Sequence, residues 1–404
     1  MKMESQPNQL QIRFVTKQDR YSVPDNPFAV PSSIVVKELN ALLRSLIDES
    51  PGQRIAAEFD FIAGGELVVR PLGDHLARLG VSAESVVDVE YLERRPPPEA
   101  LDCLIHDDWV SSVDVCRRAI VTGCYDNTAH LWTTTGEHKC SVSGHSGPIK
   151  AVVWAGEKFV TGSHDETCMV WEWDTEENTV RCTDICRGHT QSVECLSVSP
   201  DGGRFASGGW DKFLKIWPLD DDGESGRKKA RGSSATKAPR VTLKGHKECV
   251  TGVCWIDDVQ IATCSMDHTI RIWDAEMNSS VREIGSAKSF LGVDFSPSSG
   301  LLATGAADRL VRLYDPRSGE GQVVKVTLSS HTAWVPSVKW SAGRDTLLVS
   351  GSYDRSVKMW DLRSPTVPLY EMEGHEEKVL CTDWSLPDLI VSGSADNTLR
   401  VFRV

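Results

Sequence analysis

The sequence lacks several features that would assign a function class directly. It has no run of 18 apolar residues, so no transmembrane helix is expected. Its first residues, MKMESQPNQLQ, are polar and contain no apolar signal region. The twelve cysteines, scattered from Cys103 to Cys381, include no CxxC pair, which favours reduced intracellular thiols over a disulfide framework or a structural zinc site. A phosphate-binding loop, an HExxH motif and a Gly-x-Ser-x-Gly motif are also missing.

Basic residues are fewer than acidic residues. Lys and Arg number 44 against 57 Asp and Glu, which gives a formal net charge of −13. An acidic chain does not bind nucleic acid through its overall field, so any such contact must be local. The 404 residues are nevertheless 40% hydrophobic, which is enough for a sizeable core and argues against wholesale disorder.

A repeat organises the chain from residue 101 onward. It contains an aspartate every 40–56 residues or so: Asp126, Asp165, Asp211, Asp267, Asp308, Asp354 and Asp396. An aromatic residue follows six positions later: Trp132, Trp171, Trp217, Trp273, Tyr314, Trp360 and Phe402. A Ser or Thr stands four positions earlier: Thr122, Thr161, Ser207, Thr263, Thr304, Ser350 and Ser392. Six units have a histidine further upstream: His106, His145, His189, His246, His331 and His375. The period is that of a four-stranded propeller blade.

Each unit predicts two short strands joined by a tight turn that contains the aspartate, for example Leu347–Ser350 and Ser356–Trp360. The His, Asp and Ser/Thr side chains can form a chain of hydrogen bonds that ends at the Trp ring nitrogen. With Gly-His elements such as Gly144-His145 and Trp-Asp elements such as Trp360-Asp361, the sequence resembles the WD40 family. The resemblance predicts an all-β, seven-bladed propeller over residues 101–404.

Two units depart from the pattern, and the ring needs closing. The fifth unit has no histidine near Ser286, and the first has Ile105-His106 in place of Gly-His. The last unit ends after its third strand. An open ring would leave an unpaired strand edge, so we expect Leu101–Ile105 to supply the missing fourth strand.

The recurrence of Ser, His and Asp invites a hydrolase interpretation, which the pattern disfavours. A catalytic triad is needed once, in a cleft with oxyanion donors, whereas this set recurs in most units. We therefore expect a binding protein without enzymatic activity, cofactor or small-molecule substrate.

Binding would use exposed turns. The residues before the repeat aspartates include Tyr125, Trp210 and Tyr353, which are candidate partner contacts, since Trp and Tyr are favoured interface anchors. Packing against the next blade is the alternative role for these side chains.

An insertion at about residues 219–240 interrupts the propeller region. It contains an acidic run, a basic run and a Ser/Ala/Pro tail, a composition that predicts a disordered loop. Its basic run, Arg227, Lys228, Lys229 and Arg231, has two readings: a nuclear import signal or simply a solvated loop.

Residues 1–95 do not fit the repeat. The pattern predicts a strand at Leu10–Val15 with a partner at Tyr21–Val23, and a helix at 34–47 capped by Ser33. Val35, Leu39, Leu42, Leu43 and Leu46 are expected to share one face of that helix. A hairpin at 59–69, a short helix at 72–79 and a strand at 85–92 are expected to follow. The order resembles the ubiquitin-like β-grasp fold, an α+β domain. Residues 96–100, with Pro96-Pro97-Pro98, are predicted to be a stiff linker.

A ubiquitin-like domain followed by a WD40 propeller resembles two ribosome-assembly families, the Notchless proteins and the WD-repeat subunits of Pescadillo–BOP (PeBoW) complexes. The length, seven units, and the segments HDDWVSSVDV and GHSGPIKAV favour the second. This resemblance implies a nucleolar and nucleoplasmic factor for the large (60S) ribosomal subunit and its precursor rRNA. It implies that the propeller binds the BOP-type propeller scaffold, and Pescadillo through it, on the pre-60S particle. No membrane is implied.

The resemblance also implies that the ubiquitin-like domain docks on midasin, a giant AAA+ ATPase. Glu84, in the loop before the last predicted strand, matches the position that completes midasin's metal site, so it would be a metal ligand in trans. From sequence alone, a lone loop glutamate is usually just solvated. A different interpretation rests on Trp360-Asp361-Leu362-Arg363, which matches a pattern of propellers that serve as substrate receptors of cullin-RING ubiquitin ligases. Ordinary WD repeats also produce this pattern.

Overall fold

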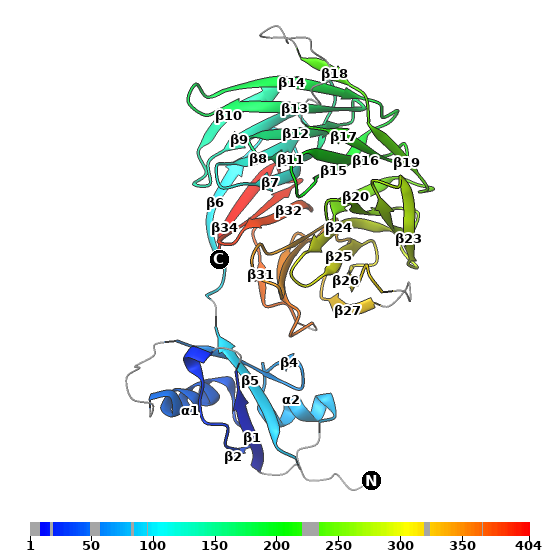
Figure 1. The fold of residues 1–404 in the computed structure, drawn as a ribbon. Coiled ribbons are helices and arrows are strands. Elements are labelled where there is room, and N and C mark those ends of the chain that lie inside the picture. Colours follow the sequence, from blue (N-terminus) through cyan, green and yellow to red (C-terminus); the bar gives the residue numbers. More distant parts are fainter. Residues whose placement is uncertain are drawn as a thin grey trace. The chain divides into compact units, whose positions relative to one another are not determined.

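The computed structural model describes residues 9–16, 19–48, 57–81, 85–94, 96–219, 234–318, 324–365 and 367–404. The chain forms two compact units: the first extends to Pro97, and the second begins at Pro98 and contains most of the remaining chain (Figure 1). Among these described residues, no helix is long and apolar enough to cross a membrane. The insertion residues 220–233, with the basic run, and residues 82–84 lie outside the described part.

The first unit combines one mixed sheet with two helices. Its elements are β1 (Gln9–Val15), a short 3-10 turn (Asp19–Tyr21), β2 (Phe28–Pro31), α1 (Val36–Asp48), β3 (Phe59–Ala63), β4 (Glu66–Leu67), α2 (Leu72–Leu79) and β5 (Val87–Glu93). The described strands pair in the order β2-β1-β5-β3-β4, and β1 runs parallel to β5 while the other pairs are antiparallel. The predicted first strand, hairpin, short helix and last strand are confirmed.

The partner predicted for β1 is wrong. Residues 21–23 form no strand, and Phe28–Pro31 pairs with β1 instead. Tyr21 is buried in the core, where its ring lies 5.1 Å from that of Phe59 in an edge-to-face contact. Its carbonyl accepts a hydrogen bond from the Tyr91 hydroxyl at 2.6 Å. Tyr21 therefore acts as a core residue of the connection that leads to β2.

Helix α1 begins two residues later than predicted, because Glu38, not Ser33, bonds its first turn: the Val35 N–H donates to Glu38 Oε2 at 3.1 Å. Leu39, Leu43 and Ile47 are its buried residues, whereas Val35, expected on that face, is 38% exposed. The buried Asn40 amide exchanges two 2.7 Å hydrogen bonds with the backbone of Phe59 and so fixes α1 against β3.

The second unit contains seven sheets within its described residues. The first sheet contains β7 (Val110–Val115), β8 (Ile120–Cys124), β9 (Thr128–Trp132) and β10 (His138–Ser143). The second contains β11 (Ile149–Ala155), β12 (Lys158–Ser163), β13 (Thr167–Asp174), β14 (Thr179–Arg187) and β18 (Ala235–Lys237). The third contains β15 (Val193–Val198), β16 (Arg204–Gly209), β17 (Phe213–Pro218) and β19 (Val241–Lys244). The next two are β20 (Val250–Trp255), β21 (Gln260–Ser265), β22 (Thr269–Asp274) and β23 (Ser279–Gly285); β24 (Phe290–Ser296), β25 (Leu301–Ala306), β26 (Leu310–Tyr314) and β27 (Val324–Ser329). The last two are β28 (Ser337–Trp340), β29 (Leu347–Gly351), β30 (Val357–Asp361) and β31 (Tyr370–Met372); β32 (Val379–Leu386), β33 (Leu389–Ser394), β34 (Thr398–Arg403) and β6 (Glu99–Ile105).

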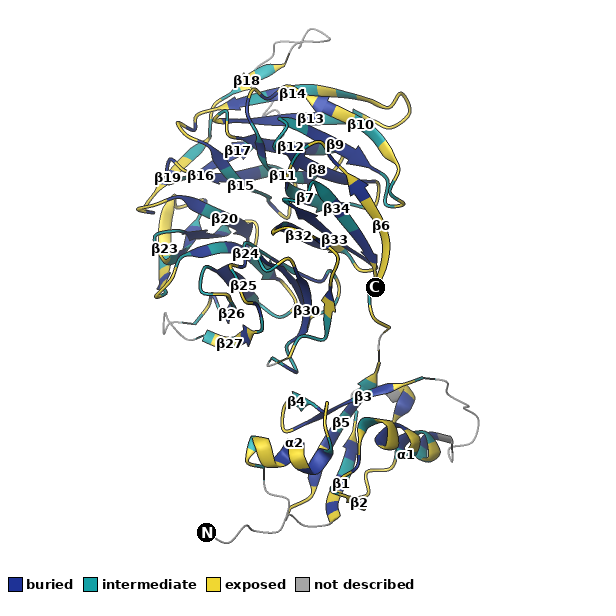
Figure 2. Ribbon diagram, turned by 180° about the vertical axis from the view of Figure 1, so that it is seen from behind, coloured by how far each residue is buried: buried dark blue, intermediate teal, exposed yellow. Residues whose placement is uncertain are grey.

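These sheets follow one another around a closed ring. The first strand of each sheet contacts the first strand of the next, and β32 of the last sheet contacts β7 of the first. Strand β6 pairs antiparallel with β34, which confirms that the start of this region supplies the missing fourth strand. Buried residues fill the inner strands, whereas outer strands such as β6 and β23 are largely exposed (Figure 2). Because β6 begins at Glu99, the last two residues of the predicted linker 96–100 belong to a strand instead.

One part of the insertion also differs from the sequence-based expectation. Ala235–Lys237, predicted to be disordered, form the short strand β18, which pairs in parallel with β14. The Lys237 ammonium lies 3.4 Å from the buried carboxylate of Asp184 on β14. This ion pair gives the predicted loop an anchor on the edge of the second sheet.

The turn at each repeat aspartate has one geometry throughout the ring. The residue that follows the aspartate has a positive φ in all seven units: Asn127, Glu166, Lys212, His268, Arg309, Arg355 and Asn397. The aspartate side chain accepts a hydrogen bond from the backbone N–H two residues further on, as Asp165 does from Thr167 at 3.0 Å. A carboxylate at this position therefore holds the chain in a turn that most side chains disfavour.

The predicted chain of hydrogen bonds is confirmed in most sheets. In the second sheet, His145 joins Asp165 (Nδ1 to Oδ2, 2.9 Å) and Thr161 (Nε2 to Oγ1, 2.7 Å). The Trp171 ring N–H donates to the same Thr161 hydroxyl at 2.8 Å. The same bonds recur around His189, His246 and His331, and around His375 without a ring nitrogen because Phe402 takes the place of Trp.

The fifth and first sheets depart from this network, as the sequence predicts. In the fifth sheet, Arg312 takes the place of the histidine and binds Asp308 through two hydrogen bonds of 3.1 and 2.6 Å. In the first sheet, His106 bonds Thr122 at 2.9 Å, but Asp126 bonds Thr128 at 2.6 Å and not His106.

Carboxylates on the inner strands link neighbouring sheets. Asp114 accepts a hydrogen bond from the backbone N–H of Trp154 in the next sheet (2.6 Å), and Asp294 does the same for Trp340 (2.8 Å). Asp383 of the last sheet accepts from the Val115 N–H of the first at 3.1 Å, so one of these bonds closes the ring. Burial raises the pKa of both Asp114 and Asp383.

Candidate functional site

The three predicted contact residues occupy equivalent places in their sheets. Tyr125, Trp210 and Tyr353 each lie in the turn between the second and third strands. Each backbone N–H donates to a carbonyl in the loop that precedes the first strand of the same sheet. The acceptors are Trp109 (3.0 Å), Ser192 (2.9 Å) and Trp334 (2.9 Å), respectively. These turns and loops therefore belong to one face of the ring.

A pocket of about 300 Å³ at the inner strands is lined in part by Tyr125, Tyr353, Lys150 and Glu194. The Lys150 ammonium donates to the Tyr125 hydroxyl at 2.6 Å and lies 3.5 Å from Glu194 Oε2. The Trp210 ring N–H donates to Glu194 Oε1 at 2.9 Å. Burial raises the pKa of Tyr353, and the nearby Tyr125 raises it further. The structure thus brings the three predicted residues together around one lysine and one glutamate.

Two further tryptophans extend this cluster. Trp109 is 44% exposed and its ring lies 5.2 Å from that of Tyr125. Trp334 is 49% exposed and stacks on Tyr353, with ring centroids 5.9 Å apart and an interplanar angle of 24°. Trp210, 45% exposed, is the third large aromatic residue open to solvent here. We call these five residues, Trp109, Tyr125, Trp210, Trp334 and Tyr353, the aromatic face.

The sequence-based prediction missed Trp109 and Trp334 because it considered only the residue before each aspartate. A second regularity would have found them: each stands three residues after the upstream histidine of its unit, His106 or His331. Both belong to units that also have a tyrosine before the aspartate, so aromatic pairs form across the turn and the loop.

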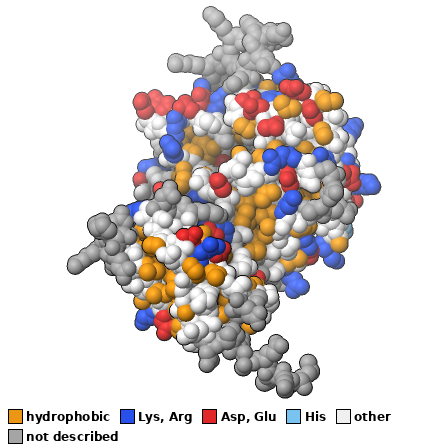
Figure 3. All heavy atoms as spheres, turned by 60° about the horizontal axis from the view of Figure 1, so that its bottom comes forward, with side chains coloured by type: hydrophobic (Ala, Val, Ile, Leu, Met, Phe, Trp, Pro, Cys, Tyr) orange, Lys and Arg blue, Asp and Glu red, His pale blue; other side chains and the backbone are white. Residues whose placement is uncertain are grey.

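The aromatic face already holds cations against its rings. The Lys150 ammonium lies 4.7 Å from the centre of the Tyr125 ring, and that of Lys378 lies 5.4 Å from the centre of the Tyr353 ring. Exposed Trp and Tyr side chains of this kind are typical anchors of protein interfaces. In the view of Figure 3, hydrophobic side chains lie on the surface among Lys, Arg, Asp and Glu side chains.

The recurring Ser, His and Asp residues have a different role. The Ser350 hydroxyl is fully buried, bonds His331 at 2.7 Å and receives the Trp360 ring N–H at 2.8 Å. Hydrogen bonds from His331 and Ser356 outweigh the effect of burial and hold the pKa of Asp354 well below its ordinary value. Every member of this set is bonded within its own sheet, which is the arrangement of a structural network.

Other candidate residues lie outside the described part of the chain. Glu84 falls within residues 82–84, between α2 and β5, and the basic run falls within residues 220–233. The preceding helix ends at Gly80, whose φ of 68° and N–H bond to the Ala77 carbonyl form a left-handed cap. The proposed metal ligand and import signal therefore remain predictions.

Comparison with known proteins places the chain in a family. The model for the NLE (NUC135) domain matches residues 10–76, and that for the WD domain, G-beta repeat, matches six segments: 136–172, 180–218, 237–274, 279–315, 322–361 and 366–403. A ribosome biogenesis protein WDR12 homolog from Ixodes scapularis is 45% identical over 98% of both chains. Homologs with the same name from Aedes aegypti (45% identical, over 98% of this chain and 95% of the relative) and Drosophila virilis (44%, over 100% and 97%) are similarly close. The chain belongs to the WDR12 family of ribosome biogenesis proteins.

Proposed function

We propose that this chain is a non-enzymatic scaffold for assembly of the large (60S) ribosomal subunit and processing of its precursor rRNA, acting in the nucleolus and nucleoplasm. The observation that carries this proposal is the 45% identity, over 98% of both chains, to a relative named for ribosome biogenesis. The seven sheets around a closed ring support a seven-bladed WD40 propeller. The order β2-β1-β5-β3-β4, with β1 parallel to β5, supports a ubiquitin-like first domain.

The aromatic face would bind the BOP-type propeller scaffold and, through it, Pescadillo on the pre-60S particle. Interface energy concentrates in a few Trp, Tyr and Arg side chains that become fully desolvated. Three exposed tryptophans of the aromatic face, each in contact with a buried or half-buried partner, provide such anchors at low entropic cost.

Replacing Trp210 tests this interface. We expect Trp210→Ala to weaken binding of the BOP-type scaffold at least tenfold, about 1.4 kcal/mol, because an anchor is lost. Met277, 74% exposed and located in the turn between β22 and β23, provides the control: Met277→Ala should bind as the wild type does. Binding is measured by isothermal titration calorimetry. Equal affinity of wild type and Trp210→Ala would reject this face as the contact.

The ubiquitin-like domain would dock on midasin, with Glu84 as an oxygen ligand to the metal ion of the partner. Hard cations such as Mg²⁺ prefer carboxylate ligands, and a loop can present one away from its own fold. Force that the ATPase applies to this domain would pass through the Pro96–Pro98 segment to the propeller and remove the complex from the pre-ribosome.

Replacing Glu84 tests the midasin contact. Glu84→Ala should abolish binding to the metal-site domain of midasin, and Glu84→Asp should weaken it because the shorter side chain reaches less far. Asp74, an exposed carboxylate on α2, provides the matched control, and Asp74→Ala should bind normally. Binding is measured with and without Mg²⁺ by surface plasmon resonance. Unchanged affinity of Glu84→Ala would reject the assignment while leaving the propeller contact untouched.

The ubiquitin-ligase alternative finds no support in the site. Trp360, the first residue of the pattern Trp-Asp-Leu-Arg, is fully buried and its ring nitrogen is bonded to Ser350. This tryptophan is a member of the repeat network, so the pattern follows from the ordinary WD repeat and adds no separate argument for that function.

A further inference from the structure

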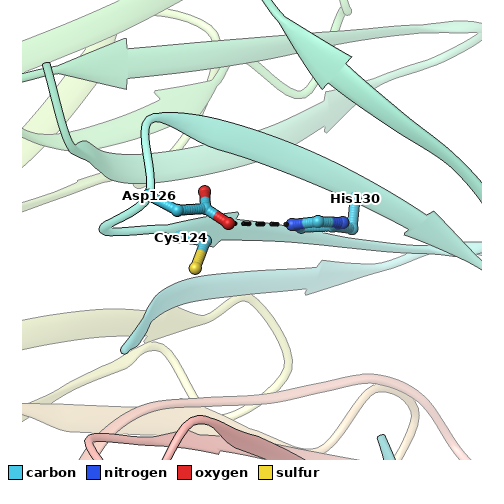
Figure 4. Close-up of side chains that lie close together, drawn as sticks. All are labelled: Cys124, Asp126 and His130. Carbon is cyan, nitrogen blue, oxygen red and sulfur yellow. Dashed lines mark ion pairs between the residues drawn. The ribbon is translucent and has the colours of Figure 1, made fainter. Parts of the chain in front are cut away.

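The first sheet contains a group of side chains that is not joined to the upstream histidine as Asp165 is joined to His145 in the second sheet. Cys124 ends β8, Asp126 lies in the following turn and His130 lies on β9. Their ligand atoms all lie within 4.8 Å of one another, and among the described residues this is the one such group of Cys, His, Asp or Glu. Asp126 and His130 point toward each other, with Cys124 beside Asp126 (Figure 4).

The atoms that face one another are suited to a metal ion. Asp126 Oδ2 lies 3.6 Å from His130 Nε2. Ser141 Oγ lies 3.0 Å from the other ring nitrogen of His130, Nδ1, so it can accept the proton that Nδ1 carries when Nε2 binds an ion. Thr128 bonds the other carboxylate oxygen, Asp126 Oδ1, through its N–H (2.8 Å) and its hydroxyl (2.6 Å), which leaves Oδ2 facing His130. The same hydroxyl lies 2.9 Å from His130 Nε2 and would give up this contact when an ion binds.

A second observation points to the same place. The His106 side chain is only 5% exposed, and its Nδ1 has no hydrogen-bond partner in the part of the chain that the structure describes. The His106 ring lies 5.0 Å from that of His130. In the second sheet the equivalent nitrogen, Nδ1 of His145, meets Asp165 at 2.9 Å. His106 Nε2 bonds the Thr122 hydroxyl at 2.9 Å, so Nδ1 is the ring nitrogen that can act as a ligand.

We propose that the first sheet binds one Zn²⁺ ion through Cys124 Sγ, Asp126 Oδ2 and His130 Nε2, whose ligand atoms lie within 4.8 Å of one another. The His106 ring lies outside this group, and it would turn its unpaired Nδ1 toward the ion to complete the tetrahedral set that suits Zn²⁺. One thiolate and one carboxylate balance the two charges of the ion. The Cys124 thiol, which is 3.3 Å from the Asp108 carbonyl, loses its proton to solvent as the Zn–S bond forms.

The ion would have a structural role. It would connect the loop before β7, which carries His106, to the turn between β8 and β9, which carries Asp126. In the second sheet the direct bond between His145 and Asp165 makes this connection. The absence of CxxC pairs, which speaks against a cysteine-rich zinc site, does not bear on a mixed site with one thiolate.

Cobalt substitution of the full-length protein tests the site. Titration of the metal-free chain with Co²⁺ should give the absorption bands of tetrahedral cobalt and a thiolate-to-cobalt charge-transfer band, both saturating at one equivalent. Zn²⁺ should displace the cobalt. Cys124→Ser should lose the charge-transfer band, and His130→Gln should weaken Zn²⁺ binding at least tenfold. Cys140, a half-buried thiol on β10 of the same sheet, is the control, and Cys140→Ser should behave as the wild type.

The wild-type titration alone can overturn the proposal. A chain that binds less than one equivalent of Co²⁺, or binds it without a charge-transfer band, has no such site, whatever the variants do. Loss of the band in Cys140→Ser with retention in Cys124→Ser would assign the thiolate to a different residue and would equally overturn it. Circular dichroism of each variant separates loss of a ligand from loss of the fold.

Discussion

The first and second sheets of the ring contain the same residue types at the same spacing but use them differently. Each has a histidine, a threonine 16 positions later, an aspartate 20 positions later and a tryptophan six positions after that: His106, Thr122, Asp126 and Trp132 in one, His145, Thr161, Asp165 and Trp171 in the other. Only the second sheet joins its histidine to its aspartate. Equal spacing therefore predicts the strands but does not by itself determine the hydrogen bonds between them.

The difference is explained by the residue four positions after the aspartate. Met169 occupies this place in the second sheet and leaves Asp165 to His145. In the first sheet the same place is taken by His130, whose ring lies 3.6 Å from Asp126 and whose Nε2 is 2.9 Å from Thr128. We infer that the His130 imidazole competes with His106 for Asp126 and leaves the nitrogen of His106 unpaired. The longer cationic side chains at the same place in four other sheets leave the histidine–aspartate bond intact: Lys215, Arg271, Lys358 and Arg400.

Removing the histidine from each sheet should separate the two arrangements most clearly. His145→Ala leaves Asp165 and Thr161 without a buried partner, so we expect it to lower the free energy of unfolding by about 3 kcal/mol. His106→Ala removes only the bond to Thr122 and a nitrogen that has no partner. We therefore expect it to lower the free energy of unfolding by about 1 kcal/mol. Urea denaturation followed by tryptophan fluorescence, with EDTA present, measures both. Equal losses would show that the two sheets are energetically equivalent despite their different bonds.

The dependence of stability on pH provides a second comparison of the two sheets. Burial alone would raise the pKa of Asp165, but hydrogen bonds from His145 and Thr167 outweigh it and hold the pKa well below its ordinary value. The folded state therefore binds fewer protons than the unfolded state as the pH falls through the ordinary aspartate pKa of about 4. The stability that this carboxylate contributes is fully present above that pH and is lost below it.

The free energy of unfolding should therefore fall between about pH 6 and about pH 3 in both proteins. We expect the fall to be about 1–2 kcal/mol smaller in His145→Ala than in the wild type, because Asp165 has a more ordinary pKa in the variant. His106→Ala should also lose less stability than the wild type toward acid, but for a different reason: burial lowers the pKa of His106 to about 4, so the unfolded wild-type chain binds a proton that the folded chain does not. Unfolding midpoints measured across this range, in buffers of constant ionic strength, provide the comparison. A His145→Ala variant with the acid sensitivity of the wild type would contradict it.

Sequence periodicity predicted the ring well because the strands repeat a pattern with a physical cause. The aspartate fixes a left-handed turn, and the aromatic residue six positions later lies in the core between sheets. Ring closure was predictable from the missing fourth strand, and pairing of β6 with β34 confirms it. The same logic failed for Tyr21, because a tyrosine in a polar segment can be buried through contacts with residues distant in sequence, here Phe59 and Tyr91.

The candidate site was only partly accessible to sequence reasoning. Tyr125, Trp210 and Tyr353 were found because they share a position in the repeat. Their convergence through Lys150 and Glu194 depends on how neighbouring sheets place their inner strands, which no spacing reveals. The departure of the first sheet was predicted, but the part that His130 plays in it was not, since His130 lies outside the repeat pattern.

Replacing His130 should convert the first arrangement into the second. In His130→Met, with EDTA present, nothing competes for Asp126, and the carboxylate can turn toward the unpaired nitrogen of His106. The position tolerates this side chain, because Met169 is buried at the equivalent place in the second sheet. A new buried hydrogen bond is expected to raise the free energy of unfolding by about 0.5–1 kcal/mol, seen as a higher urea midpoint. The companion variant His130→Met/His106→Ala should gain nothing, because it lacks the nitrogen that the carboxylate would meet. If His130→Met alone is no more stable than the wild type, competition from His130 is not what separates the two sheets, and the difference must arise in the backbone between His106 and Asp126.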